Sequence, residues 1–267
     1  MAALLALAGG GLLVAVAMSR GGSPLAFLDP IAFLFVLGGT IAATLINYPL
    51  PRVKAALGAL RAAFARQRQE LSDLVLTMLD YAERARREGV LDLEDEAEHA
   101  PDPCLRAGLS LVVDGTDPES VREILENDLA ALEARQKLGA GLFETMATYA
   151  PGFGMVGTLI ALVQMLQKLD DPSRLTTGMA TALLPTLYGV LLANLFFTPL
   201  AGKLKVRATE EVQRAELILE GLLAIQAGDT PGILAQKLNS FLPPEQRTRR
   251  ATVRDLYDDE DTGREVG

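Results

Sequence analysis

The stretch APGFGMVGTLIALVQML, residues 150–166, decides the fold class. It carries no charged side chain, as expected of a helix that crosses roughly 30 Å of hydrocarbon with about 20 residues. Yet it begins with a proline at Pro151, is interrupted by glycines and places Thr158 near its middle. These residues are poor helix formers in isolation. We therefore expect the segment to pack against protein or to line a path, and not to face lipid on all sides.

Four stretches of the chain lack charged side chains, and their lengths match membrane-spanning helices. They are residues 1–19, 30–51, 145–167 and 175–202. A helix in a soluble core would normally show a charged stripe every few residues. The sequence therefore predicts an all-α integral membrane protein with four transmembrane helices and a helical cytoplasmic domain. Residues 1–19 resemble a secretory signal at AVAMS, 15–19, but they lack a basic start, so we favour a retained helix.

Basic residues lie beside these stretches mainly on one side of the membrane. They are Arg52, Lys54, Arg61, Arg66 and Arg68 after the second, Arg135 and Lys137 before the third, and Lys203, Lys205 and Arg207 after the fourth. The two short connections hold Arg20, and Lys168 and Arg174 together with Asp170 and Asp171. The positive-inside rule then places both termini in the cytoplasm.

These features divide the chain into five predicted segments. They are two transmembrane helices in 1–51, a helical cytoplasmic domain in 52–144, two further transmembrane helices in 145–202, cytoplasmic C-terminal helices in 203–245, and a charge-dense tail in 246–267 that we expect to be disordered. The periodicity of residues 71–89 predicts a helix that ends at Gly89. Asp117 and Pro118 predict the start of a helix that continues unbroken into the third span.

Composition argues against several classes of function. The net charge of −9 does not suit a nucleic-acid binder. The single cysteine, Cys104, and the single histidine, His99, form neither a disulfide framework nor a metal-binding pattern. No pairing of nucleophile and base and no phosphate-binding loop is present, so we expect no enzymatic activity and no bound cofactor or permanent metal.

The third and fourth spans each carry a stripe of small and hydroxyl residues. The stripes are Pro151, Gly154, Thr158, Ala161 and Met165 on the third, and Ala182, Thr186, Gly189 and Ala193 on the fourth. Such stripes allow membrane helices to pack closely, and packing alone would account for each residue taken singly. The alternative is an ion path. Because no span contains Asp, Glu, Lys, Arg or His, a conducting protein would need a carboxylate from another chain.

Several segments bring a known family into view. Residues 150–204 resemble the third and fourth spans of the A subunits of flagellar stators, the MotA/PomA branch of the MotA/TolQ/ExbB family. The segments FLDPIAFLFVLGGTIAATL, ARREGVLDLED and GLLAIQAGDTPGILAQKLNSFLP resemble that family's second span, charged cytoplasmic segment and C-terminal signature. The likeness covers about residues 12–247 and is closer to the sodium-type members than to the proton-type ones.

This resemblance implies a bacterial flagellar motor stator in the inner membrane, serving flagellar rotation and chemotaxis. In such stators five A subunits form a homopentamer around two single-pass B subunits, MotB/PomB-like, each of which supplies one membrane Asp. Cation flow past that Asp turns the A ring against the rotor C ring, whose contact protein is FliG-like. The partners implied are therefore the B subunit, the rotor protein, membrane lipid and further copies of the chain, without nucleic acid.

The resemblance also carries roles to particular positions. The ion pathway is assigned to Thr158, Thr186, Pro151, Pro185, Pro199 and Tyr188, with transient Na⁺ near the two threonines. Thr158 occupies a position that is a hydroxyl in sodium-type members, so sodium is the expected ion. Pro185 replaces the first of two adjacent threonines that sodium-type members often carry, and it is either a feature of the ion site or a kink. The rotor contact is assigned to Arg86, Arg87, Glu94 and Asp95, which otherwise read as a solvated charged loop.

Three alternatives to a sodium-driven stator remain at this point. A proton-driven stator would share the same architecture. An energiser of the ExbB/TolQ kind works an outer-membrane system, but those proteins generally have three spans. A non-conducting membrane scaffold would need only the small-residue stripes.

Overall fold

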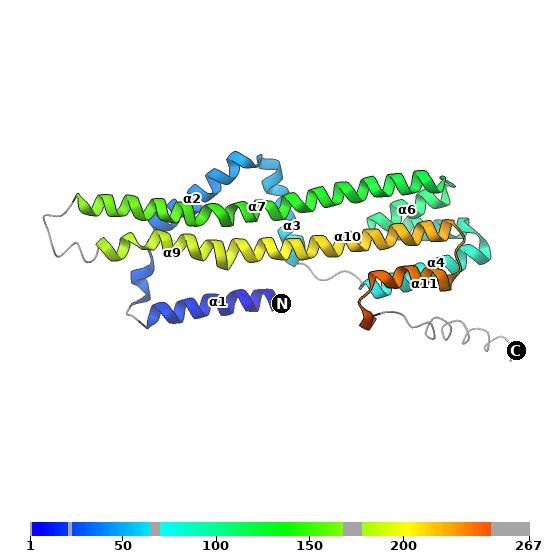
Figure 1. Cartoon of the computed structure of the whole chain (residues 1–267), viewed down its shortest axis with the longest axis horizontal. Helices are drawn as coiled ribbons and strands as arrows, with labels where there is room; N and C mark the ends of the chain where they lie inside the picture. Colours follow the sequence, from blue (N-terminus) through cyan, green and yellow to red (C-terminus); the bar gives the residue numbers. More distant parts are fainter. Residues whose placement is uncertain (1, 21–22, 65–69, 168–177, 247–267) are drawn as a thin grey trace. The chain divides into compact units, whose positions relative to one another are not determined.

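The structure is a computed structural model that describes residues 2–20, 23–64, 70–167 and 178–246 (Figure 1). Side chains are described from Ala8 onward, apart from that of Ala62. Within these ranges every regular element is helical, which confirms the predicted all-α class. The expected disorder of the tail concerns residues outside the described ones, except for Gln246. The charged connection with Lys168, Asp170, Asp171 and Arg174 also lies outside them.

The order of elements follows the sequence prediction closely. The α-helices are α1 (Ala2–Ser19), α2 (Pro30–Asn47), α3 (Leu50–Phe64), α4 (Leu71–Glu88), α5 (Glu94–His99), α6 (Pro103–Val113), α7 (Pro118–Leu166), α9 (Leu184–Leu191), α10 (Thr198–Gln226) and α11 (Pro231–Leu238). The short elements are η1 (Pro24–Phe27), η2 (Val90–Leu93), η4 (Asn239–Phe241) and η5 (Pro244–Gln246), which are 3₁₀ turns, and η3 (Leu192–Phe197), which is a π-helix.

Local signals explain where several helices begin and end. The carboxylate of Asp29 caps α2 by accepting from the amides of Ile31 and Ala32 at 3.0 and 3.1 Å. Gly89 ends α4 at a φ of 94°, a left-handed value that favours glycine. Asp117 accepts from the amide of Ser120 at 3.0 Å, where α7 begins. The predicted ends at Gly89 and Asp117 are therefore confirmed, and α7 continues for 49 residues as predicted.

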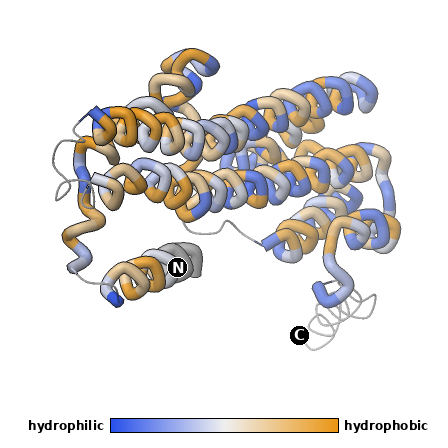
Figure 2. The backbone as a smooth tube through the Cα atoms, turned by 60° about the vertical axis from the view of Figure 1, so that its left-hand side comes forward, coloured by the Kyte–Doolittle hydropathy of each residue, from blue (hydrophilic) through white to orange (hydrophobic). Residues whose placement is uncertain are grey.

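Two compact units make up the chain. The first, here called the membrane unit, comprises residues 1–65 and 135–207, and the second, the cytoplasmic unit, comprises 66–134 and 208–267. Residues 52–65 and 135–144, which we predicted to belong to the cytoplasmic domain, lie in the first unit. The assignment of the five segments to membrane or cytoplasm stays a prediction, and the two names are labels only. Hydrophilic residues concentrate in the first turns of α7, in the cytoplasmic unit (Figure 2).

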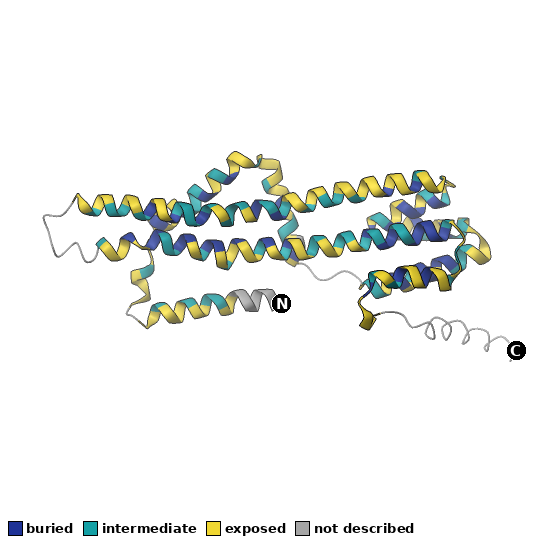
Figure 3. Cartoon of the chain, viewed as in Figure 1, coloured by how far each residue is buried: buried dark blue, intermediate teal, exposed yellow. Residues whose placement is uncertain are grey.

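Three helical segments of the described chain are long and apolar enough to cross a membrane. They are Pro24–Asn47, Pro118–Leu166 and Gly178–Gln226, and each overlaps most of one predicted span. The first predicted span corresponds to α1, whose described side chains, Ala8–Ser19, form a shorter apolar stretch. None of those side chains is buried (Figure 3).

The core of the membrane unit joins α2, α3, α7 and the segment from η3 into α10. Its buried members include Val36, Ala56, Ala63, Ala140, Leu142, Phe143, Ala150, Leu192, Phe197, Ala201 and Leu204. Gly39 of α2 leaves the space that the ring of Phe153 fills, because a Cβ there would overlap that ring. Small residues thus set how closely these helices pack.

A separate core holds the cytoplasmic unit together. Buried side chains from α4, α6, α11 and the parts of α7 and α10 in this unit form one cluster, including Leu74, Met78, Leu93, Leu109, Val121, Leu217, Leu222 and Leu234. Asp102 caps α6 through the amide of Cys104 at 2.9 Å and pairs with Arg214 at 3.8 Å, both side chains being nearly buried. Because a buried charge without a partner is costly, this pair fixes α6 on α10.

Candidate ion pathway and cytoplasmic charge cluster

Glycines bring the backbones of α7 and α9 into contact. A Cβ added to Gly154 would lie 2.8 Å from the carbonyl oxygen of Pro185, and one added to Gly189 would lie 2.6 Å from that of Ala150. Neither carbonyl belongs to a flexible side chain, so no other residue fits at these two positions without moving a helix. The crossing therefore depends on glycine in both helices.

Three oxygen atoms meet where the two helices cross. The Thr158 and Thr186 hydroxyl oxygens lie 2.6 Å apart, and the Gly154 carbonyl oxygen lies 3.1 Å from the first and 3.3 Å from the second. Two hydroxyl protons are thus shared among three oxygens. The two predicted hydroxyls are brought together, and the Gly154 carbonyl, one turn before Thr158, joins them. The contact of Thr186 with that carbonyl was not predicted. We call this group the oxygen cluster.

The oxygen cluster has no charged partner within the described spans. Residues 145–167 and 178–202 contain no Asp, Glu, Lys, Arg or His. The oxygen cluster therefore consists of three neutral oxygens from two helices, with no charged group of its own in these spans.

The three predicted prolines occupy different positions in their helices. Pro151 lies inside α7, one turn before the oxygen cluster, where it removes an amide donor. Pro185 is the second residue of α9, after a turn at Leu183, and its carbonyl faces Gly154. Pro199 is the second residue of α10, directly after the π-helix η3.

The π-helix η3 has a physical cause in Pro199. Proline has no amide hydrogen, so the normal hydrogen-bond ladder cannot continue through it. The amide of Thr198 donates to the carbonyl of Ala193, five residues back, as in a π-helix. Such bulges are frequent at functional sites, and no feature of the sequence marks η3 other than the proline that follows it.

Tyr188 lies apart from the oxygen cluster. Its hydroxyl donates to the carbonyl of Phe27 at 2.5 Å and accepts from the amide of Asp29 at 2.7 Å, while its ring packs edge-on against Phe33. Tyr188 therefore ties α9 to the chain segment that leads into α2. The structure does not bring it together with Thr158 and Thr186.

A cavity of about 560 Å³ lies beside the crossing, among α2, α7 and the residues before α9. Its lining includes Phe35, Gly157, Ala161, Thr181 and Pro185. Among the described lining residues, Asp29 at the start of α2 is the only one with a carboxylate. The cavity thus adjoins the helix crossing through Gly157 and Pro185, and the carboxylate of Asp29 already caps a helix.

The four predicted rotor-contact residues are all exposed on the cytoplasmic unit. Arg86 and Arg87 lie in the last turn of α4, and Glu94 and Asp95 open α5. Arg87 pairs with Glu83 one turn earlier in α4. Exposed charges at such a surface orient a partner more than they add affinity.

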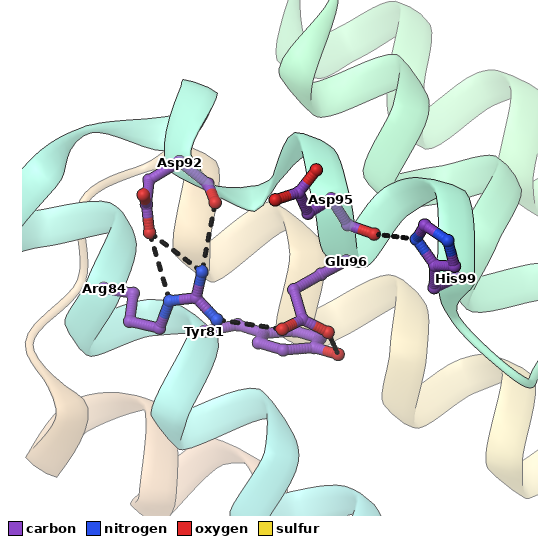
Figure 4. Close-up of polar contacts among 6 residues, drawn as sticks. All are labelled: Tyr81, Arg84, Asp92, Asp95, Glu96 and His99. Carbon is purple, nitrogen blue, oxygen red and sulfur yellow. Dashed lines mark hydrogen bonds and ion pairs between the residues drawn. The ribbon is translucent and has the colours of Figure 1, made fainter.

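A second set of charged residues fixes the turn between α4 and α5, and sequence analysis missed it. Arg84 donates from Nε and Nη2 to Asp92 Oδ2 at 3.1 and 2.9 Å, and from Nη1 to Glu96 Oε1 at 2.9 Å (Figure 4). The Tyr81 hydroxyl donates to Glu96 Oε2 at 3.1 Å. The turn that carries Glu94 and Asp95 is therefore held in one conformation.

Protonation within this set follows from burial and charge. Burial, followed by the charge of Glu96, raises the pKa of Tyr81 to about 12. The hydrogen bonds to Asp92 and Glu96 raise the pKa of Arg84. Tyr81 is thus a neutral donor and Arg84 a cation throughout the physiological range.

His99 and Cys104 lie outside this set. The exposed His99 ring contacts the carbonyl of Asp95 through Nδ1 at 2.9 Å. Burial raises the pKa of the Cys104 thiol to about 11, so it is protonated at neutral pH. Within the part of the chain that the structure describes, no three His, Cys, Asp or Glu side chains gather as a metal site.

The fold and the helix crossing define a class of helical membrane proteins, and the comparisons identify it. A profile of the MotA/TolQ/ExbB proton channel family matches residues 96–217. Motility protein A of Borreliella burgdorferi is 40% identical over 90% of this chain and 92% of its own length. Chemotaxis protein PomA of Vibrio alginolyticus is 37% identical over 92% of this chain and 97% of its own. The chain therefore belongs to the MotA/TolQ/ExbB family.

Solved structures agree with this assignment. The structure of C. jejuni MotAB superposes with a TM-score of 0.88 at 26% identity, covering 93% of this chain and 98% of the other. The flagellar MotAB stator complex from Bacillus subtilis superposes with a TM-score of 0.85 at 32% identity, covering 91% and 96%. The helical membrane fold is thus shared with stator components.

Proposed function

We propose that this chain is an A-type stator subunit of a bacterial flagellar motor, acting in the inner membrane with both termini in the cytoplasm. The observation that carries the proposal is the oxygen cluster of Thr158, Thr186 and Gly154, placed in membrane helices without a carboxylate. A channel of this kind conducts when a second chain brings the missing charge. Relatives named motility protein A and structures of MotAB complexes support that architecture.

The partner that completes the channel is a MotB-like single-pass subunit carrying one membrane aspartate. Its carboxylate would lie against the side of the α7–α9 crossing on which Thr186 sits. A homopentamer of this chain surrounds two copies of that partner in the arrangement we propose. Release of a cation from each aspartate in turn drives the ring by one step.

Sodium is the cation we propose. Dehydrated Na⁺ requires several oxygen ligands, and two hydroxyls and a carbonyl already lie within 3.3 Å of one another here. A proton would need only the carboxylate or a chain of water. The competing proposal is a proton-driven stator, which the name of the family favours.

The prolines and Tyr188 support the pathway in different ways. Pro151, Pro185 and Pro199 shape the helices around the oxygen cluster and allow them to bend as the cation passes. Tyr188 acts from a distance by holding the start of α2 against α9. We assign the contact with a FliG-like rotor protein to Arg86, Arg87, Glu94 and Asp95. These four charges are exposed, and they lie on either side of the turn that Arg84 fixes.

Motility of a stator-less strain tests the proposal. Expression of this chain with a MotB-like partner should restore swimming, and replacing sodium by potassium at constant pH should stop it. If swimming is restored and continues unchanged when potassium replaces sodium, sodium coupling is rejected and the proton-driven alternative is favoured. Failure to restore swimming, together with rescue of an outer-membrane energy-transfer defect, would favour an ExbB/TolQ-like function.

A further inference from the structure

Helix α3 carries an exposed stripe in which apolar and basic side chains alternate. At roughly 100° per residue, positions 50, 54, 57, 61 and 64 fall within an arc of about 80°. The residues are Leu50, Lys54, Leu57, Arg61 and Phe64, and all five are exposed. Leu50 is 62% exposed, Leu57 54% and Phe64 41%. We call this surface the α3 stripe.

A neighbouring side of α3 is already used for packing. Ala56 and Ala63 are buried in the core of the membrane unit, with Val53, Ala59 and Leu60 packed against it. The α3 stripe is thus not the face that attaches α3 to the rest of its unit. Three large apolar side chains of α3 remain exposed, although its core-facing side chains are already packed.

The position of α3 within the membrane unit is set by the residues it packs on. Its core contacts belong to the cluster that includes Ala140, Phe143, Ala201 and Leu204. Just before α3, the Tyr48 hydroxyl lies 3.3 Å from that of Thr145. In these parts of α7 and α10 the charged residues end and the uncharged spans begin. Glu144 of α7 and Lys205 of α10 lie at this level and form an ion pair.

The chain also turns sharply between α2 and α3 (Figure 1). Helix α2 belongs to a segment long and apolar enough to cross a membrane, and α3 begins three residues after it ends. Helix α3 therefore leaves a span at the level where the neighbouring helices become charged. A helix in that place lies at the boundary between hydrocarbon and water. The α3 stripe would then face the lipid headgroups.

The charges of α3 match such a surface. Helix α3 contains Arg52, Lys54 and Arg61 and no acidic residue, in a chain whose net charge is −9. Among the residues that the structure describes, neither Lys54 nor Arg61 forms an ion pair. Long basic side chains can lay their methylene stems on apolar surface and keep the charge among headgroups.

We propose that the α3 stripe binds anionic phospholipid headgroups at the cytoplasmic face of the membrane. Leu50, Leu57 and Phe64 enter the boundary of the acyl chains, and Lys54 and Arg61 contact lipid phosphates. Helix α3 thereby holds the parts of α7 and α10 on which it packs at a fixed depth. This role is independent of which cation the protein conducts.

A single introduced tryptophan can report this contact, because the chain contains none. Leu57→Trp places one on the α3 stripe, here called the stripe probe, and Ala55→Trp places one at an exposed position on another side of the same helix, here called the control probe. Both variants are reconstituted as full chains in nanodiscs containing brominated phosphatidylglycerol or brominated phosphatidylcholine. We expect bromolipid to quench the stripe probe at least twofold more than the control probe, and phosphatidylglycerol to quench the stripe probe more than phosphatidylcholine.

Charge variants then test the basic residues. Adding Lys54→Gln and Arg61→Gln to the Leu57→Trp chain should remove the preference for phosphatidylglycerol. Adding Arg52→Gln, which removes one charge on another side of α3, should leave that preference intact. Circular dichroism establishes that each variant is folded before its quenching is compared.

Three results would overturn the proposal. Equal quenching of the stripe probe and the control probe would show that the α3 stripe does not face lipid. Equal quenching of the stripe probe by the two lipids would reject recognition of anionic headgroups. A stripe probe shielded from both bromolipid and aqueous acrylamide would show that a second copy of the chain covers the stripe.

Discussion

At the scale of single residues, glycine decides how α7 and α9 meet. Gly154 and Gly189 face carbonyl oxygens of the opposite helix at distances that exclude a side chain. The oxygen cluster exists because of this close approach, since Thr158 and Thr186 could not otherwise lie 2.6 Å apart. Sequence analysis identified both threonines by their resemblance to a family. The packing interpretation, in which a threonine bonds to a carbonyl one turn earlier, fits Thr158 and Gly154. The sequence did not predict that Thr186 reaches the same carbonyl, because that contact crosses between two helices.

We predict that Gly154→Ala destabilises the protein by about 1–3 kcal/mol, because the added Cβ overlaps the Pro185 carbonyl. Gly152→Ala is the matched control in the same helix, since nothing lies within 4 Å of its Cβ. That control should be neutral or should stabilise by about 0.5–1 kcal/mol. Thermal unfolding in detergent, followed by circular dichroism, compares the two. Equal midpoints for both variants would mean that α7 and α9 do not pack as described.

We also predict that Thr158→Ala reduces sodium-driven torque far more than it reduces expression, because one of three oxygens is lost. Thr158→Ser retains the hydroxyl and should restore most of the torque. The measurement is the rotation speed of tethered cells at several sodium concentrations, with expression followed by immunoblot. An equal loss of torque and expression would show that Thr158 is structural.

At the scale of elements, the turn between α4 and α5 is fixed by charges that lie under an exposed surface. The sequence predicted where α4 ends, because Gly89 is a local signal. It did not predict that Arg84 joins α4 to Asp92 and Glu96, since residues eight and twelve positions apart across a helix end carry no periodic signal for such a contact. The π-helix η3 was missed for a similar reason, because Pro199 alone permits either a kink or a bulge.

Arg84 and Arg87 should therefore differ in their effects. We predict that Arg84→Gln destabilises the cytoplasmic unit by about 1.5–3 kcal/mol, the range for hydrogen bonds to charged groups. Arg87→Gln loses only an exposed pair within one helix, worth about 0.3–0.5 kcal/mol. Urea unfolding of both variants compares the two effects. A stable Arg84→Gln chain with normal helicity would remove the structural role assigned to this arginine.

Tyr81 gives the same turn a dependence on pH. Its pKa is raised to about 12 by burial and by Glu96, so the folded state holds the phenolic proton more tightly than the unfolded state. The resulting stabilisation is complete below about pH 10, the ordinary tyrosine pKa, and is lost as pH rises toward 12. We predict that Tyr81→Phe unfolds with a weaker pH dependence than the parent chain between these values. Parallel curves for the two chains would contradict the assigned shift.

At the scale of the whole molecule, the distribution of charge determines what the chain can do alone. The predicted spans hold hydroxyls, glycines and prolines but no Asp, Glu, Lys, Arg or His, while the remaining segments hold many charged residues. The sequence therefore predicted the helical membrane class and the absence of an internal carboxylate. It did not predict the α3 stripe, because the core-facing side of α3 becomes evident only once Ala56 and Ala63 are seen to be buried.

We predict that the purified chain, reconstituted alone in liposomes, passes no sodium current, because the oxygen cluster lacks the negative charge that would hold a dehydrated cation. Co-reconstitution with a MotB-like partner should produce sodium uptake above that background. A partner with its membrane aspartate replaced by asparagine is the matched control, and it should return uptake to background. Sodium-sensitive dye inside the liposomes reports all three conditions. Robust uptake by this chain alone would show that its own oxygens suffice, and the requirement for a second chain would then be wrong.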